Sequence, residues 1–209
     1  MVRVGIFRDG ETPGEQIYIG DATLVEGARP DVAAAFPSLP FATRAGWGYL
    51  LLTNVLPGGG TGSYRLHAYA DDIEGHTTLI ASRTITCTNS TATQPFGTID
   101  APGQGEVVSG IIVNWGWVLT PQDASIVNGS AIDVVVDGVA VGHPTYGVNR
   151  PDVAALFPGY SNSSGAGGYF MLDTTLLADG LHTIAWVVRD DKGNVSGLGS
   201  RYFTVDNGS

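Results

Sequence analysis

The chain contains an internal sequence repeat, and this repeat constrains its fold more than any other feature. Residues 29–38 read RPDVAAAFPS and residues 150–159 read RPDVAALFPG. Segments on both sides of this phrase recur in the same order, so residues 2–87 and 130–205 are two copies of one unit. The further matching segments are 7–10 with 135–138, 45–56 with 166–177, and 69–87 with 187–205.

The second copy has a strand pattern. AIDVVVDGVAVG (131–142) predicts two strands around a turn at Asp137 and Gly138, because Asp-Gly between apolar runs is a strong hairpin signal. GYFMLD (168–173) predicts another strand, and the turn DKGN separates two more at 181–190 and 200–205. The 30 glycines of the chain fit a fold with many turns. Short strands at regular spacing predict an all-β sandwich.

The repeated phrase predicts one or two turns of helix that bridge the sheets. Proline suits the first helical position, since its missing N–H has no helical partner there, and Pro151 stands at this place. The Asp152 carboxylate then complements the helix dipole, and Pro158 ends the run. The side chains expected to face the core are Val153, Leu156 and Phe157, matched by Val32, Ala35 and Phe36.

The second copy has an additional front end. FGTIDAPGQGEVVSGIIVNWGWVLT (96–120) predicts two more strands, in which Val113, Trp115, Trp117 and Leu119 alternate onto one face that we expect to lie in the core. Nothing before residue 2 matches this stretch, so we expect the first copy to lack its opening strand pair. The predicted domains are therefore 1–88, incomplete, and 96–209, complete, with a linker at 89–95.

At these residues the chain resembles a family of bacterial immunoglobulin-like tandem repeats. The stretches that carry the resemblance are GTIDAPGQGEVVSG with Gly116 and Trp117, VVVDGVAVGHPTYGVNRPDVAALFP, and LDTTLLADGLHTIAWVVRDDKGN. The match covers nearly all of 96–206 and is weaker over 2–87, where LDTT has become LLTN. The resemblance implies two tandem immunoglobulin-like sandwiches, the first without its opening strands. It also implies an extracellular or cell-surface, non-catalytic module, without indicating a ligand.

Charge and composition exclude several classes of partner. The net charge of -10 argues against nucleic acid, which needs a basic footprint. No apolar run approaches the roughly 20 residues that span a bilayer, so we expect no membrane insertion. MVRVGIFRDGETPG lacks the apolar region of a signal peptide, which leaves two alternatives: a protein that stays in the cell, or an exported one whose leader was removed. The single cysteine, Cys87, allows no disulfide within the chain and aligns with Val205, so we expect it to be a buried small apolar residue.

The sequence contains no clear catalytic or metal motif. The four histidines are scattered, and neither a nucleophile elbow nor a phosphate-binding loop occurs, so we predict no enzyme activity and no cofactor. Arg29 with Asp31 and Arg150 with Asp152 form a repeated pair, interpreted as structural anchors of the helical turn, with a paired binding site as the alternative. The acidic turns, with Asp71, Asp72 and Glu74 in the first copy and Asp190 and Asp191 in the second, allow calcium binding as an alternative to a purely structural turn. A platform on which sugars stack is an alternative role for the tryptophans Trp47, Trp115, Trp117 and Trp186.

Asparagines stand out among the polar residues. Five of the eight open an N-x-Ser/Thr triplet, and all five lie in expected loops or linkers, where a glycan is tolerated. The glycosylation candidates are Asn89, Asn128, Asn162, Asn194 and Asn207. A bias of Ser-rich and Gly-rich loops toward such triplets is the alternative explanation.

The missing strands lead to a hypothesis about function. The first copy is a fragment, a reduced sandwich, or a unit that a neighbouring molecule completes by strand addition. The last account makes the chain a self-assembling structural protein, a homo-oligomer or polymer that forms a surface fibre or layer. The expected docking edge is Val2, Val4, Ile6 and Phe7, with residues 88–100 as the segment available for exchange. An adhesin or carbohydrate-binding spacer of a secreted protein is the alternative function.

Overall fold

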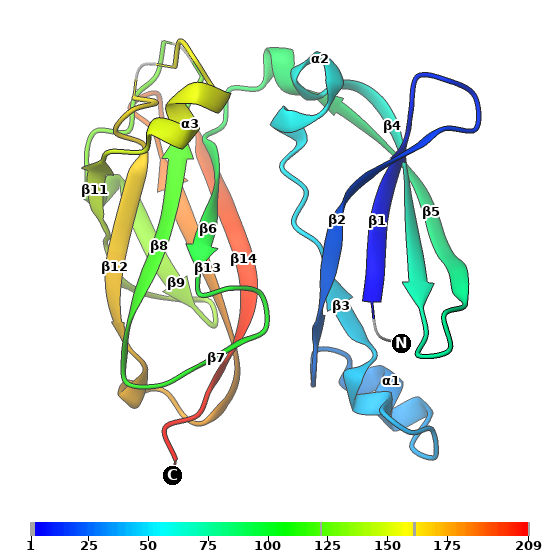
Figure 1. Cartoon of the computed structure of the whole chain (residues 1–209). Helices are drawn as coiled ribbons and strands as arrows, with labels where there is room; N and C mark the ends of the chain where they lie inside the picture. The colour runs from blue at the N-terminus through cyan, green and yellow to red at the C-terminus, as the bar shows by residue number, and fades with distance from the viewer. Residues whose placement is uncertain (1–2, 122, 161, 209) are drawn as a thin grey trace. The chain divides into compact units, whose positions relative to one another are not determined.

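The computed structural model describes residues 3–121, 123–160 and 162–208 and divides into two compact units, Met1–Thr91 (unit 1) and Ala92–Ser209 (unit 2) (Figure 1). Both units consist mainly of strands, which confirms the all-β prediction. Three short helices interrupt them: α1 (Pro30–Ala35), α2 (Pro57–Gly60) and α3 (Pro151–Leu156). α1 and α3 carry the repeated phrase. Among the described residues, no helix is long and apolar enough to cross a membrane.

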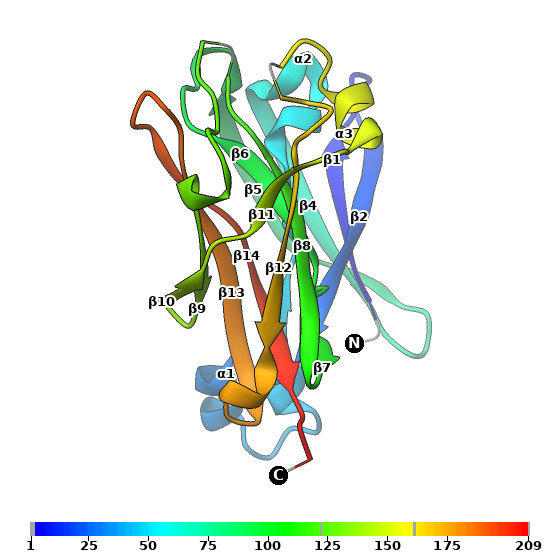
Figure 2. The ribbon, with the colours of Figure 1, turned by 90° about the vertical axis from the view of Figure 1, so that its left-hand side faces the viewer.

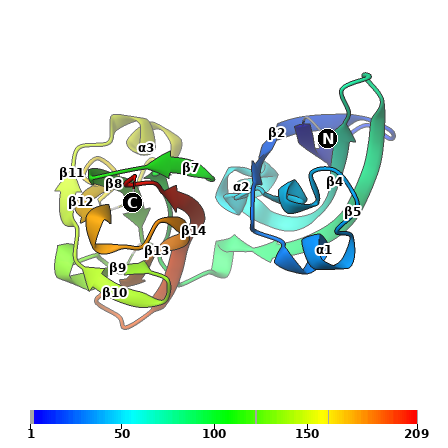
Figure 3. The same ribbon diagram turned by 90° about the horizontal axis from the view of Figure 1, so that it is seen from below.

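Unit 2 is a two-sheet sandwich, seen face-on in Figure 2. One sheet has the order β10-β9-β13-β14-β7, and the other has the order β11-β12-β8-β6. The strands are β6 (Phe96–Ala101), β7 (Glu106–Val108), β8 (Ile111–Leu119), β9 (Ile132–Val136), β10 (Val139–Gly142), β11 (Thr145–Val148), β12 (Gly167–Asp173), β13 (Gly180–Arg189) and β14 (Val195–Val205). Seen from below, they surround the core of the unit (Figure 3).

Trp186 fills the centre of that core. The side chain is fully buried, and its indole N–H donates to the Oδ1 of Asn114 on β8 at 2.7 Å. Two glycines of the facing sheet make room for the ring: a Cβ added at Gly116 or Gly168 would approach it at 3.1 or 3.2 Å. The sheet that contains β8 and β12 is therefore shaped around this tryptophan.

The structure corrects the expected role of the alternating aromatic residues on β8. Asn114 contacts the core tryptophan, and successive side chains of a strand point to opposite faces, so Trp115 and Trp117 lie on the outer face of the sheet. Trp117 is nevertheless buried, because the rings of Phe96 and of Phe157, which follows α3, pack edge-on and tilted against it at centroid distances of 6.2 and 5.6 Å.

α3 thus packs against the outer face of one sheet, instead of bridging two. Val153 and Phe157 are buried, as their expected core-facing positions require. Leu156 is 63% exposed, so that part of the predicted stripe is wrong: the short helix turns this side chain toward solvent.

Unit 1 is one five-stranded sheet with the order β3-β2-β1-β4-β5. Its strands are β1 (Arg3–Asp9), β2 (Gln16–Val25), β3 (Gly46–Gly48), β4 (Thr61–Asp71) and β5 (Thr77–Thr88). The pairing follows that of unit 2, since Ile6 opposite Ala68 corresponds to Val134 opposite Trp186. β4 and β5 correspond to β13 and β14, and β3 to β12. The described part of unit 1 contains no counterpart of β6, β7 or β8, as expected for a copy without its opening strands.

The predicted docking edge is wrong. β1, which carries Val4, Ile6 and Phe7, is the middle strand and pairs with β2 on one side and β4 on the other. Val2 lies outside the described residues. The edge strands of the sheet are β3 and β5 instead, because the missing strands would flank these two. The stretch 88–100 is not a free segment either, since β6 begins at Phe96 and pairs with β8.

Candidate functional site: the open face of unit 1

The inner face of the unit 1 sheet has only a small core. Its buried apolar cluster comprises Val4, Ile6, Ala22 and Ala68, whereas thirteen described residues form the cluster of unit 2. Beside it lies an apolar hollow of about 200 Å³, to which Ile6, Trp47 and Leu66 contribute. In unit 2 the equivalent face is covered by β6 and β8. The sheet of unit 1 therefore presents apolar surface where unit 2 has its second layer.

The hollow coincides with an exchange of large and small side chains between the units. Trp186 of unit 2 has Ala68 as its counterpart, and Gly168 has Trp47. Both Trp47 and Ala68 line the hollow. The large side chain is thus Trp47 on β3 in unit 1, and Trp186 on β13 in unit 2. Trp47 remains 39% exposed, since the described part of unit 1 has no counterpart of β6 or β8 to cover it.

The repeated arginine–aspartate pairs have the same local geometry in both units. Arg29 donates two hydrogen bonds to Asp31, at 2.8 and 2.7 Å, and Arg150 donates two to Asp152, at 2.9 and 2.7 Å. These bidentate hydrogen bonds lower the pKa of each aspartate to about 2. Both pairs lie at the start of a helix, which is where a structural anchor would act.

The two arginines differ in their further contacts. Arg150 uses a third nitrogen, Nη1, to donate to the Oδ2 of Asp100 on β6 at 2.6 Å, and its side chain is 14% exposed. The described residues of unit 1 form no strand at this place, and the Arg29 side chain is 55% exposed. Its hydrogen bonds within the described residues go to Asp31 alone.

The helices also differ in how they pack. Phe157, which follows α3, is 7% exposed because it lies against Phe96 and Trp117. Its counterpart Phe36, which follows α1, is 53% exposed. Ala35 is exposed as well, and Val32 is half-buried. The expected core-facing stripe of the first copy is therefore largely unburied, because the strands that would receive it are absent from the described unit.

One histidine forms a network that the sequence did not suggest. Nδ1 of His67 lies 2.8 Å from the Oγ of Ser82, and Nε2 lies 2.7 Å from the Oδ1 of Asp9. Ser, His and Asp are the residue types of a hydrolase triad. His67 is among the residues that line the hollow, but alternation with Leu66 and Ala68 on β4 directs its imidazole to the opposite face of the sheet. The network links β1, β4 and β5, and neither Ser82 nor Asp9 is among the residues that line the hollow.

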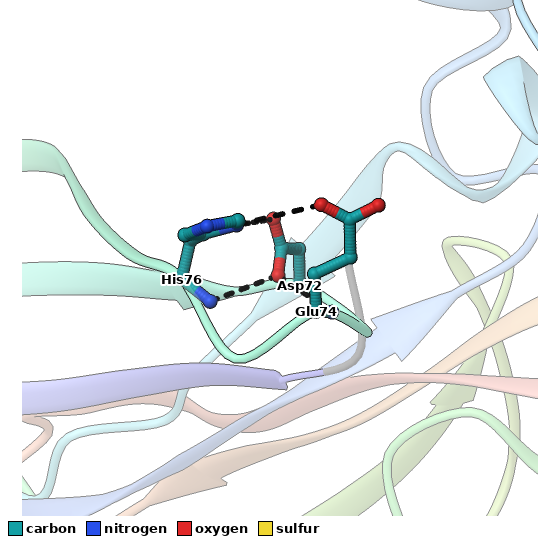
Figure 4. A group of neighbouring side chains, drawn as sticks. All are labelled: Asp72, Glu74 and His76. Atoms are coloured by element: carbon teal, nitrogen blue, oxygen red, sulfur yellow. Dashed lines mark hydrogen bonds and ion pairs between the residues drawn. The ribbon is translucent and has the colours of Figure 1, made fainter.

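The turn between β4 and β5 brings three potential metal ligands together (Figure 4). Asp72, Glu74 and His76 offer ligand atoms within 4.8 Å of one another, all on exposed side chains. Asp72 accepts the backbone N–H groups of Glu74 and His76 at 2.8 and 2.9 Å, and the bond from His76 is the main reason why its pKa is lowered. The sequence analysis noted the acidic residues but missed His76, because the spacing becomes meaningful only when the turn folds.

The same turn exists in unit 2 without this ligand set. There Asp190 accepts the backbone N–H groups of Lys192 and Asn194 at 3.0 and 2.9 Å. A lysine and an amide replace the glutamate and the histidine, yet the turn is preserved. The aspartate thus has a structural role in both units, and the cluster in unit 1 carries no further evidence of a bound ion.

The glycosylation candidates differ in how their side-chain nitrogen is engaged. Four of them donate it to a hydrogen bond within their own unit: Asn89, Asn162, Asn194 and Asn207. Asn128 is exposed, and its oxygen accepts the N–H and the hydroxyl of Ser130 at 2.8 and 2.6 Å. Because a glycan is attached to the nitrogen, the fold leaves Asn128 the most open of the five. Glycosylation itself stays a prediction.

Cys87 is only half-buried, in contrast to its fully buried counterpart Val205. The expectation of a buried cysteine is therefore met in part. Its strand, β5, lacks the neighbour that β7 provides for β14 through parallel pairing. The partial exposure thus has the same origin as that of Phe36.

Comparisons with known proteins add little beyond the fold. No family model matches the sequence, and no curated protein matches it either. Among solved structures, fibronectin(III)-like modules of Clostridium thermocellum CbhA align with 98% of this chain and 78% of theirs, at 14% identity and a TM-score of 0.38. The endo-beta-1,4-mannanase of Thermotoga petrophila aligns with 58% of this chain and 22% of its own, at 16% identity and a TM-score of 0.38.

Proposed function

We propose that the chain is a non-catalytic structural module of a secreted or cell-surface protein, and that unit 1 joins it to a neighbouring molecule. The observation that carries this proposal is the open face: a sheet with an apolar hollow and two edge strands where unit 2 has a complete second layer. Addition of strands from a neighbour would pair the backbone of these edges and cover the hollow.

Exposed aromatic side chains support this function. The large aromatics exposed among the described residues all lie in unit 1, and none lies in unit 2. They are Tyr18, Phe36, Phe41 and Trp47. Trp47 lines the hollow itself, and aromatic residues are enriched at protein interaction sites.

The edge strand β5 sets the kind of assembly. It is 12 residues long, and a long unpaired edge is a template for another strand. A molecule that accepts strands at unit 1 and donates them elsewhere makes a head-to-tail contact, which closes into rings or continues as fibres. Self-assembly through sheet edges into a fibre or layer is therefore the favoured function.

Electron microscopy and light scattering of the full chain over a range of concentrations test this proposal. We expect ordered assemblies that disappear in Ile85→Lys. Ile85 lies two residues from the hollow-lining Arg83 and therefore on the same face of β5, where an added charge blocks strand addition. Thr88→Lys places the same charge on the outer face of β5 and should assemble normally. Discrete monomers at every concentration, with unprotected β5 amides in hydrogen exchange, would contradict assembly and favour the binding-module alternative.

A further inference from the structure

Two arginines of unit 2 face acidic residues of its opening strands. Arg150 donates to Asp100 of β6 at 2.6 Å. Arg201 on β14 is half-buried, and its Nε has no hydrogen-bond partner among the described residues; burial lowers its pKa, and the charges of Asp100 and Glu106 only partly offset this. The segment that completes this sandwich therefore brings negative charge to two separate guanidinium groups.

Unit 1 keeps both arginines although it has no such segment. Arg29 is the counterpart of Arg150, and Arg83 on β5 is the counterpart of Arg201 by its place opposite Leu66. Arg83 lines the apolar hollow. A guanidinium beside apolar surface becomes costly once that surface is covered, unless the covering group supplies a carboxylate. The positive charges thus restrict what can cover the hollow.

Phe36 gives a second restriction, independent of charge. In unit 2 the equivalent ring packs against Phe96, which lies four residues before Asp100 on the same strand. A strand that presents an aspartate to Arg29 in the β6 geometry would place its earlier residue against Phe36. An aromatic or large apolar residue at that position would bury a ring that is now half-exposed.

We infer that the segment accepted by unit 1 is a strand pair of the same type as residues 96–120, with an aspartate for Arg29, an acidic residue near Arg83 and an aromatic residue for Phe36. This inference rests on the proposed function and specifies its partner: an acidic, β6-to-β8-like strand pair of a neighbouring molecule. Neutral or basic strands would pair with the edges of the sheet but leave both arginines without a carboxylate.

A synthetic peptide of residues 96–120 tests the inference on the full chain. We expect saturable binding, measured by fluorescence anisotropy of a labelled peptide, with new hydrogen-exchange protection in β3 and β5. An Asp100→Asn peptide should bind about tenfold more weakly or worse, as loss of a buried charge pair predicts. Arg29→Ala in the chain should weaken binding of the unaltered peptide by a similar factor, and the two changes combined should weaken it no further.

Arg65→Ala is the matched control. It removes the same charge from the exposed outer face of β4 and should leave the affinity unchanged. If the Asp100→Asn peptide binds as tightly as the unaltered one, the inference that Arg29 requires an aspartate is overturned. The proposal that unit 1 accepts added strands is then still supported by the binding itself.

A second experiment applies if the isolated peptide does not form strands in solution. A copy of residues 96–129 placed directly before Val2 should protect β3 and β5 in the same chain, and Asp100→Asn within that copy should reduce the protection at least about tenfold. Asp123→Asn in the copy, an exposed position outside the strands, is the control. If neither peptide nor appended copy protects these edges, both the inference and the proposed function are wrong.

Discussion

The two units share a strand order but differ in how much of their apolar surface is buried. Phe157 and Trp186 are almost fully buried in unit 2, whereas Phe36 is half-exposed in unit 1 and an open hollow lies over Ala68. Strand pairing follows the same register in both. Register is therefore a local property of the repeated sequence, while burial depends on the strands β6 and β8, which have no counterpart among the described residues of unit 1.

The largest difference should appear when the tryptophans are truncated. Trp186→Ala removes the centre of the unit 2 core and leaves the buried Asn114 amide without its indole donor, so the free energy of unfolding of unit 2 should fall by about 4–5 kcal/mol. Trp47→Ala should cost unit 1 no more than about 1–2 kcal/mol, because the ring is partly solvated already. Urea unfolding with hydrogen exchange resolved by unit measures both. Equal losses would mean that the hollow of unit 1 is covered.

A smaller difference should separate the two helix-flanking phenylalanines. Phe157→Ala should destabilise unit 2 by about 3 kcal/mol, since the ring fills the space between α3 and Trp117. Phe36→Ala should change the stability of unit 1 by less than about 0.5 kcal/mol in the isolated molecule. The same urea measurement applies. A large effect at Phe36 only under conditions of assembly would sharpen the comparison, because it would place this ring in the contact.

The smallest predicted effect is a pH dependence confined to unit 2. Burial of the His182 imidazole is the largest single influence and opposes its charged form. The hydrogen bonds with Asp137 and with the carbonyl of Ala178, together with the charge of Asp137, outweigh burial, so the pKa of His182 is raised above 6.5. The charged pair therefore stabilises unit 2 below this pH, and the contribution is lost as pH rises through the raised pKa. We expect a decrease of at most about 1 kcal/mol in unfolding free energy between pH 6 and 9.

His182→Gln should abolish this slope, whereas His76→Gln, a change at an exposed turn of unit 1, should preserve it. Unit 1 has Tyr64 at the position of His182, so its own stability should not follow the same slope. An unchanged slope in His182→Gln would assign the pH dependence to other groups.

The sequence predicted the architecture well because the repeat is strong evidence. The hairpin at Asp137 and Gly138, the short helix after Arg150 and the incomplete first copy all follow from local signals or from the comparison of copies. The face of β8 was assigned wrongly, since alternation separates two faces but does not say which one meets the other sheet. Trp117 is buried on the outer face only because α3 returns to cover it.

The candidate site was less accessible to sequence reasoning. The docking edge was assigned to β1 because the missing strands precede it in the chain, but spatial order differs from chain order, and the neighbours of the missing strands are β3 and β5. The contact from Arg150 to Asp100 spans 50 residues, and no spacing rule connects them. His76 was also missed because no spacing rule connects it with Asp72 and Glu74, although these three residues lie within five positions of the sequence.

The parallel pairing of β7 with β14 has a mechanical consequence. Phe203 lies opposite Glu106, and Val205 opposite Val108. When the two ends of unit 2 are pulled apart, β7 and β14 are drawn in opposite directions along their length, so their hydrogen bonds are loaded in shear and must fail together. Every described strand pair of unit 1 is antiparallel. A strand added in parallel beside β5 would give unit 1 the same shear-loaded pairing that β7 gives β14 in unit 2.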